Sequence, residues 1–329
     1  MRFINFIYKN IIKLSFIITL IFSFSSNAET ILVSNEGSDN ITIIDLKTYE
    51  VIATIDSGNR PRDMHYVSSS NSLLVAASED DTINIIDMNT FEITGNLETG
   101  DDPEIFDISP NGKIAVVSNE DDNAATVIDI TSGKIIRVIE DVGIEPEGVN
   151  FSPDGQLVYI TSEGTNTVLI IDPWEGKVIE EILVGNRPRR GAFTKNGQEY
   201  WVTNELGGTV SVIDTNSFKV IHNIKFEKKG IRSTEITPVD FAMSNDGSLA
   251  YITLGRSKHV AVVQTKNYDV IDYILAGSRV WGAAISSDDK TLIVTNGNSD
   301  DISIIDTDKR ASIKSIAVGR TPHTVRIID

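Results

Sequence analysis

The chain has 329 residues and a formal charge of −18, with 47 acidic residues against 29 lysines and arginines. This balance disfavours nucleic acid as a partner, because a phosphate backbone is bound through clustered basic side chains. Cysteine is absent from the sequence, which excludes disulfides, thiolate metal sites and a lipid-modified cysteine.

The first 28 residues have the pattern of an export signal. They contain three basic residues and no acid, an apolar segment over residues 14–24, and the small residues Ser26 and Ala28 before the expected cut. An uncleaved anchor is the alternative, but this segment is short of the roughly 20 residues that span a bilayer. We therefore expect a signal peptide over residues 1–28 and a periplasmic mature chain over residues 29–329, with a charge of −21 and no membrane span.

The mature chain is a series of similar copies, each marked by an aspartate before a polar turn. The marker positions are Asp45, Asp87, Asp129, Asp172, Asp214, Gln264 (which replaces the aspartate once) and Asp306. Successive steps are 42, 42, 43, 42, 50 and 42 residues, so there are seven copies with one irregular spacing. A period near 42 that is built from strands is typical of propeller blades.

Each copy reads as four short strands separated by turns. In the fourth copy, EGVNFSP and LVYITSE flank the turn residues Asp154-Gly155, and TVLIIDP and VIEEILVG follow. Glycine tolerates the positive φ that such hairpin turns require. We therefore predict an all-β fold, a seven-bladed propeller of four-stranded antiparallel blades with almost no helix.

The two ends of the mature chain are complementary. It opens at TILVSN, which is the second strand of a copy, and finishes with TPHTVRIID, which is a lone first strand. We expect one shared blade, with residues 322–328 as its inner strand and residues 31–56 as the other three. This arrangement would close the ring and remove a free strand edge.

The recurring aspartate is expected to be structural, since its carboxylate can accept hydrogen bonds from the amides of the following turn. The 50-residue step marks an insertion before Pro238, with Lys225, Lys228, Lys229 and Arg232 in an otherwise acidic chain. Single-copy insertions tend to lie on the working face of a repeat protein. A solvated loop is the alternative interpretation.

Acidic residues also recur at the exit of the second strand, which we call the acidic rim: Glu36, Glu79, Glu120, Glu163 and Glu205. In a four-stranded blade, this exit and the connection to the next blade lie at the same end. The carboxylates would therefore crowd one rim, either to receive a metal ion or cationic partner or to form a solvated face.

The connections between blades differ from copy to copy and are the strongest functional lead. A proline opens six of the seven inner strands and Val280 opens the other, and the proline fixes φ where no ladder donor is needed. Its neighbours should ring one mouth of the central channel: Arg60, Arg62, Glu104, Glu147, Arg187, Arg189, Arg190, Asp240, Arg279, Trp281 and His323. The arginines could bind a small anion such as a carboxylate or a quinone acid, or could form mutual salt bridges that close the channel.

The sequence contains no recognisable catalytic constellation. Of its four histidines, His65 and His323 fall on inner strands and His222 and His259 on outer ones. None matches a histidine metal motif, and nothing matches a nucleophile elbow or a phosphate-binding glycine loop. The residues themselves therefore predict a binding protein without a cofactor.

At the level of strands and turns the copies resemble the YVTN family of beta-propeller repeats. The segment WVTNELGGTVSVIDTNSFKVI from Trp201 follows that family's order of strand, loop, strand, aspartate, turn and strand. Over about 300 residues, the chain is similar to the PQQ-dependent catabolism-associated beta-propeller proteins. This similarity rests on the ordered connections RPR, DPE, EPEG, RPR, TPV and RVW, the loop NEDDN at Asn119, and the insertion before Pro238.

The resemblance implies an exported seven-bladed protein connected with quinoprotein alcohol oxidation and transport. Together with the missing catalytic constellation, it leads us to expect a non-catalytic binding protein. Its partner would be a periplasmic quinoprotein dehydrogenase, a transport component or a small anion, and PQQ or a divalent or lanthanide ion is a cofactor to test. Two other classes stay open: a haem d1-type or lactonase-type propeller enzyme, and a single-stranded nucleic-acid-binding propeller. The negative charge of the chain opposes the last of these.

Overall fold

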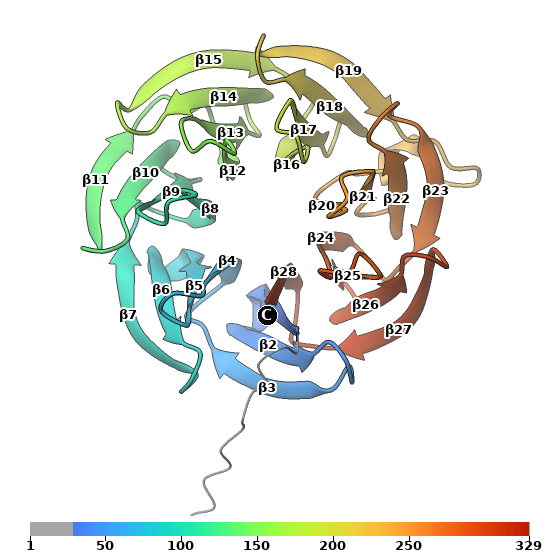
Figure 1. Cartoon of the computed structure of the whole chain (residues 1–329), viewed down its shortest axis with the longest axis horizontal. Coiled ribbons are helices and arrows are strands. Elements are labelled where there is room, and N and C mark those ends of the chain that lie inside the picture. The colour runs from blue at the N-terminus through green and yellow to red at the C-terminus, as the bar shows by residue number, and fades with distance from the viewer. Residues whose placement is uncertain (1–28, 329) are drawn as a thin grey trace, which may run out of the picture.

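The computed structural model describes residues 29–328. These residues form seven four-stranded antiparallel sheets arranged in a ring around a central channel (Figure 1), which confirms the predicted all-β seven-bladed propeller. The expected signal peptide, residues 1–28, lies outside the described residues. Within residues 29–328 no helix is long and apolar enough to cross a membrane, and the helical elements there are three short 3-10 turns.

The strands of each blade run in order from the channel to the outside. Blade 1 contains β28 (Pro322–Ile328), β1 (Thr30–Asn35), β2 (Asn40–Asp45) and β3 (Val51–Asp56); blade 2 contains β4 (Pro61–Val67), β5 (Ser72–Ala77), β6 (Thr82–Asp87) and β7 (Glu92–Glu98). Blade 3 contains β8 (Pro103–Ile108), β9 (Ile114–Asn119), β10 (Ala124–Asp129) and β11 (Lys134–Ile139); blade 4 contains β12 (Pro146–Phe151), β13 (Val158–Ser162), β14 (Thr167–Asp172) and β15 (Lys177–Leu183).

The other three blades follow the same order. Blade 5 contains β16 (Pro188–Phe193), β17 (Glu199–Asn204), β18 (Thr209–Asp214) and β19 (Lys219–Lys225). Blade 6 contains β20 (Phe241–Met243), β21 (Leu249–Thr253), β22 (His259–Gln264) and β23 (Val270–Leu275); blade 7 contains β24 (Val280–Ile285), β25 (Thr291–Asn296), β26 (Asp301–Asp306) and β27 (Ala311–Ala317). The 3-10 turns are η1 (Glu36–Ser38), η2 (Ser78–Asp80) and η3 (Ser233–Glu235).

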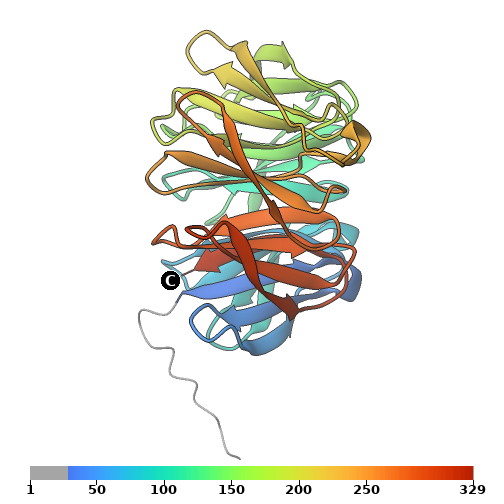
Figure 2. The ribbon, with the colours of Figure 1, turned by 90° about the vertical axis from the view of Figure 1, so that its right-hand side faces the viewer.

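Blade 1 is shared by the two ends of the described chain, as predicted. In Figures 1 and 2 the red strand β28 lies among the blue N-terminal strands. It pairs antiparallel with β1, with Val325 opposite Val33. The inner strand of this blade therefore comes from the opposite end of the sequence, and it closes the ring by covering the inner edge of β1.

The hydrophobic core is distributed between neighbouring blades. The second and third strands of a blade are buried on both faces, because each sheet packs against the sheets on either side. Trp201 and Val212 of blade 5, for example, share one cluster with Ile252 and Ala261 of blade 6. The outer strands are mostly exposed, as in β27, so the core consists of the layers between sheets.

The recurring aspartate has the structural role predicted for it. Asp45 Oδ1 accepts a hydrogen bond of 2.6 Å from the backbone N–H of Thr48, and Asp214 Oδ1 accepts one of 2.8 Å from Ser217. The turn amides lower the pKa of both carboxyl groups, with the Ser217 hydroxyl contributing most at Asp214. The aspartate therefore stabilises the turn between the third and fourth strands.

A second repeated contact joins each blade to the next. A Ser or Thr hydroxyl near the end of the second strand donates a hydrogen bond to a backbone carbonyl at the start of the next blade. In five cases the acceptor is the second residue of the inner strand, and in blade 6 it is Val239, which precedes β20. The donor and acceptor pairs are Ser34 and Arg62, Ser118 and Glu147, Thr161 and Arg189, Thr203 and Val239, Thr253 and Trp281, and Thr295 and His323. Blade 2 has Ala76 at this position. We call these contacts the hydroxyl clamps; they fix the backbone of the residues that reach the channel mouth.

Blade 6 departs from the expected pattern. Its inner strand β20 begins at Phe241, so the prediction that Pro238 opens this strand is wrong, whereas the corresponding residue opens the inner strand of every other blade. The preceding insertion is held by the buried residues Phe226 and Ile236, while the side chain of Arg232 is 84% exposed. Because the insertion is anchored, the chain enters blade 6 along a different path from the other blades. Regular strand pairing therefore begins only at Phe241.

Candidate functional site

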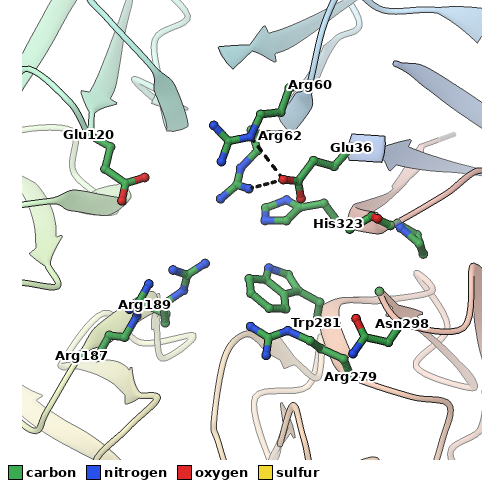
Figure 3. A pocket seen from close by; sticks show the side chains of 13 residues that line it. Glu36, Arg60, Arg62, Glu120, Arg187, Arg189, Arg279, Trp281, Asn298 and His323 are labelled. Carbon is green, nitrogen blue, oxygen red and sulfur yellow. Dashed lines mark hydrogen bonds and ion pairs between the residues drawn. The ribbon is translucent and has the colours of Figure 1, made fainter. Parts of the chain in front are cut away.

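A cavity of about 300 Å³ occupies the mouth of the channel where the inner strands begin. We call it the mouth pocket. Its lining side chains come from five blades and their connections, and Figure 3 shows them converging from opposite sides of the channel. The lining residues are Glu36, Arg60, Arg62, Glu120, Arg187, Arg189, Arg279, Trp281, Gly297, Asn298, Thr321, Pro322 and His323.

The arginines on one side of the pocket are held by glutamates, one of them buried. Arg62 forms ion pairs with Glu104 and, at 3.2 Å, with Glu36, and Arg60 shares Glu36 at the same distance. Glu104 is fully buried beneath them. Burial alone would lower the pKa of Arg62, but Glu104 and Glu36 raise it above its ordinary value, so this guanidinium stays charged.

The opposite side repeats this arrangement. Arg189 forms ion pairs with Glu163 and, at 3.1 Å, with Glu147, while Arg187 lies 2.7 Å from Glu163 and 3.3 Å from Glu205. Burial raises the pKa of Glu163 to about 7 despite the two arginines. Removing one member of such a buried pair would leave an uncompensated charge, which is strongly unfavourable. The arginines and glutamates of this wall therefore hold one another in place.

The five glutamates of the acidic rim lie in different environments. A rim glutamate faces the connection of the next blade, so its environment depends on what that connection carries. Glu36 and Glu163 face the arginines of blades 2 and 5 and pair with them. Glu79 faces the acidic connection of blade 3 and is exposed, outside the pocket lining.

Glu120 is the rim residue that differs most from the others. The connection of blade 4 offers it Glu145 and Glu147 in place of arginines, and among residues 29–328 no cation lies within ion-pair distance. Burial, followed by Glu147 and Asp102, raises the pKa of Glu120. Its carboxylate comes within 4.8 Å of carboxylates in two groups that could hold a metal ion: Asp102 with Glu104, and Glu145 with Glu163.

Arg279, Trp281 and His323 form a separate group across the pocket from Glu120 (Figure 3). The guanidinium carbon of Arg279 lies 4.3 Å from the centre of the Trp281 ring, and the Trp281 and His323 rings are 5.5 Å apart. Arg279 has one long ion pair, 3.6 Å to Glu205. Burial and then neighbouring arginines lower its pKa, although Glu205 opposes this shift. Arg279 is therefore less compensated than Arg62 and Arg189.

His323 presents a hydrogen-bond donor to this group. It is 2% exposed, and burial followed by Arg62 and Arg190 lowers its pKa well below the ordinary value, so the ring is neutral. Nδ1 lies 3.1 Å from Thr324 Oγ1, which also accepts a bond of 3.4 Å from Arg190 Nη2. Within residues 29–328, Nδ1 is the acceptor that the Thr324 hydroxyl reaches, so we infer that Thr324 donates to Nδ1 and that the ring proton lies on Nε2.

Two ring nitrogens in this group lack a partner. His323 Nε2 and Trp281 Nε1 are buried and have no hydrogen-bond partner among residues 29–328. A buried unpaired donor costs free energy, which a ligand with acceptor oxygens would recover. The group therefore combines two neutral donors, a partly compensated guanidinium and an aromatic face.

The predicted site residues fall into four places. Lining the mouth pocket are Arg60, Arg62, Arg187, Arg189, Arg279, Trp281, His323, Glu36 and Glu120; behind its walls are Glu104, Glu147, Glu163 and Glu205. Arg190 and Asp240 line a different cavity deeper in the channel, and Glu79 lies outside both. Sequence reasoning missed Thr324, whose position on an inner strand was the available signal.

Comparison with known proteins places this site on a common scaffold. Residues 148–314, slightly more than half of the chain, match the family described as lactonase, 7-bladed beta-propeller, and residues 28–151 match YNCE-like beta-propellers. No curated protein matches the chain.

Several solved structures have the same fold at low sequence identity. Hydrazine synthase from Kuenenia stuttgartiensis is 22% identical with a TM-score of 0.76, covering 84% of this chain and 92% of that one. The periplasmic gluconolactonase of Pseudomonas aeruginosa is 16% identical with a TM-score of 0.78, covering 92% and 99%. A dihydro-haem d1 dehydrogenase is 14% identical with a TM-score of 0.68, covering 90% and 74%. These likenesses show the fold, and the family match goes further: the chain belongs to the lactonase family of seven-bladed beta-propellers.

Proposed function

We propose that the mouth pocket binds a small organic anion rich in acceptor oxygens, of the sugar-acid or hydroxycarboxylate class. The observation that carries this proposal is the pair of unpartnered buried donors, Trp281 Nε1 and His323 Nε2, beside Arg279. Arg279 supplies the charge and the two ring N–H groups supply direction. The indole adds an apolar face for the carbon skeleton.

Binding is tested by calorimetry with gluconate, with glucose as the uncharged analogue. Gluconate is expected to bind, and Arg279→Gln and Trp281→Phe are each expected to weaken it about tenfold or more. Arg232→Gln, at an exposed arginine of the insertion, is the matched control. Equal affinity of the parent protein for glucose and gluconate, or full affinity in Arg279→Gln, would contradict the proposal.

A second candidate function is hydrolysis of the corresponding lactone, favoured by the position of Glu120 across the pocket from the donors (Figure 3). In this reaction Glu120 takes a proton from water as the water oxygen attacks the lactone carbonyl. Arg279 and the Nε2–H of His323 stabilise the negative charge on the carbonyl oxygen. The ring C–O bond then breaks, and the leaving alkoxide receives the proton from Glu120, which gives the hydroxycarboxylic acid. This acid releases its proton to water and leaves as the hydroxycarboxylate.

Hydrolysis is tested with gluconolactone and its 6-phosphate, the substrate classes that the names of similar propellers suggest. Glu120→Gln should lose turnover while still binding gluconate, which separates catalysis from binding. If no lactone is hydrolysed above the uncatalysed rate but gluconate binds, the protein is a binding protein, as the sequence predicts. A visible absorption spectrum tests the haem alternative in the same preparation.

The narrower role, in the periplasm beside quinoprotein alcohol oxidation, rests on the resemblance of the connection motifs. We keep a quinoprotein dehydrogenase or a transport component as the proposed protein partner, with PQQ as a further anion to test. Affinity capture from a periplasmic extract on the immobilised protein checks this role. Recovery of neither class of protein would argue against it.

A further inference from the structure

The deeper part of the channel contains a second cavity, of about 150 Å³, which we call the lower channel pocket. Each inner strand runs from the mouth towards the other end of the channel, so residues two to four positions after its opening residue lie deeper. The charged side chains that line this pocket are Asp63, His65, Asp107, Arg190, Asp240 and Arg326. Five of them follow that rule, and Asp240 lies directly before β20, two residues after Pro238. None of them lines the mouth pocket.

Part of this charge is already compensated. Asp63 Oδ1 lies 2.5 Å from Arg326 Nη2, and Asp63 Oδ2 lies 3.4 Å from His65 Nε2. Burial would raise the pKa of Asp63, but Arg326 and His65 lower it well below its ordinary value. Arg326 therefore compensates the charge of Asp63, although Asp63 Oδ2 has no hydrogen-bond partner within residues 29–328.

Arg190 is different, because it is 6% exposed and has no ion pair within 4 Å among residues 29–328. Its Nε has no hydrogen-bond partner, and Nη2 makes one long contact of 3.4 Å with Thr324 Oγ1. A buried guanidinium normally has a carboxylate or several acceptors around it. Most of its donors therefore remain available to a ligand in the pocket.

Two carboxylates in the same pocket also lack an ion pair. Asp240, 9% exposed, accepts backbone N–H bonds from Phe241 at 2.8 Å and Ala283 at 3.3 Å. Asp107, which is half-buried, accepts bonds of 2.8 Å from the amides of Ile108 and Phe151. Each carboxylate keeps lone pairs for a further donor.

We propose that the lower channel pocket is a second ligand site, specific for a small zwitterion of the α-amino acid class. The ligand carboxylate binds Arg190, and its ammonium group binds Asp240 or Asp107. A carboxylate alone would add negative charge beside two aspartates that have no ion pair, and an ammonium alone would leave Arg190 without a carboxylate partner. The cavity has room for several water-sized groups, which fits glycine, alanine or serine.

The proposal is tested by calorimetry on the full protein with glycine and alanine, against acetate and methylammonium at the same pH and ionic strength. The amino acids should bind, and the two single-charge analogues should each bind about tenfold more weakly or worse. Acetate binding as tightly as glycine, or no heat from any of the small amino acids, would overturn the proposal.

Variants locate the site. Arg190→Gln and Asp240→Asn should each lose about tenfold or more in glycine affinity, while Arg279→Gln at the mouth should keep it. Asp240→Asn is nearly isosteric and retains an acceptor for the Phe241 amide, so it decides the question if Arg190→Gln fails to fold. Loss of glycine binding in Arg279→Gln with full binding in Asp240→Asn would assign the ligand to the mouth and overturn the proposal. The Arg190 side-chain N–H resonance, which should shift with glycine and not with acetate, gives a second readout.

Discussion

Thr324 Oγ1 lies 3.1 Å from Nδ1 of His323, and from this contact we infer that the neutral ring carries its proton on Nε2. Because Arg190 donates to the same oxygen from the lower channel pocket, a residue of one cavity determines the hydrogen-bonding character of a residue in the other. The donor that His323 offers to the mouth pocket is therefore set by a contact outside that pocket.

Thr324→Val removes the hydroxyl and keeps the side-chain volume. Without its hydrogen bond, His323 should lose its preference for the Nε2–H form, which nitrogen NMR of the imidazole ring reports. Gluconate affinity should fall about fivefold, equivalent to about 1 kcal/mol, the usual value of one hydrogen bond. Thr324→Ser, which keeps a hydroxyl, should behave like the parent protein. An unchanged ring spectrum in Thr324→Val would show that Thr324 does not set the tautomer.

The pH dependence of stability should carry the signature of His323. Burial, then Arg62 and Arg190, holds its pKa well below the value of about 6.5 expected in the unfolded chain. Below pH about 6.5 the unfolded state binds a proton at His323 and the folded state does not, so protonation favours unfolding. The contribution of His323 to the free energy of unfolding is therefore complete above that pH and is lost as the pH falls.

This dependence is measured by denaturant unfolding of the parent protein and His323→Gln between neutral pH and about pH 5. The free energy of unfolding of the parent protein should decline more steeply with acidification than that of the variant. Parallel curves for the two proteins would mean that His323 is not held neutral by its surroundings.

The hydroxyl clamps predict a large effect from a small change. Thr295 is fully buried; its hydroxyl accepts a bond of 2.7 Å from the Gly282 amide and donates one of 2.8 Å to the carbonyl of His323. Thr295→Val conserves shape but leaves both buried backbone groups unpaired, which should lower the free energy of unfolding by roughly 2 kcal/mol. Thr295→Ser should lose much less. Equal unfolding curves for Thr295→Val and the parent protein would show that the clamp contributes nothing to stability.

The repeat itself made most of the fold predictable. The aspartate spacing identifies seven blades, and the incomplete copies at the two ends of the repeat region identify the shared one, because both follow from local strand and turn patterns. The residues of the hydroxyl clamps also occupy one position in six copies, Ser34, Ser118, Thr161, Thr203, Thr253 and Thr295, so this feature could have been recognised from the sequence.

The composition of the site was harder to predict, because it depends on contacts between blades. Glu36 compensates Arg62, whereas Glu120 has no ion pair, because each rim glutamate faces the connection of a different blade. This could be predicted only by knowing that a rim glutamate faces the connection of the next blade. Arg189 and Arg190 are neighbours in sequence but line different cavities, since the inner strand places Arg190 beyond the mouth pocket. Proximity to a proline could not distinguish them.

Closure of the ring by β28 predicts that its buried positions matter as much as those of any central strand. Val325 is fully buried opposite Val33, so Val325→Ala should lower the free energy of unfolding by about 2 kcal/mol through lost burial and the cavity that remains. Ile313→Ala on the outer strand β27, where the side chain is 49% exposed, should cost well under half as much. Deleting residues 321–329 should abolish the cooperative thermal transition, because β1 would then expose an inner edge that no other strand can cover. A truncated protein that melts within a few degrees of the parent would show that the ring does not depend on β28 for closure.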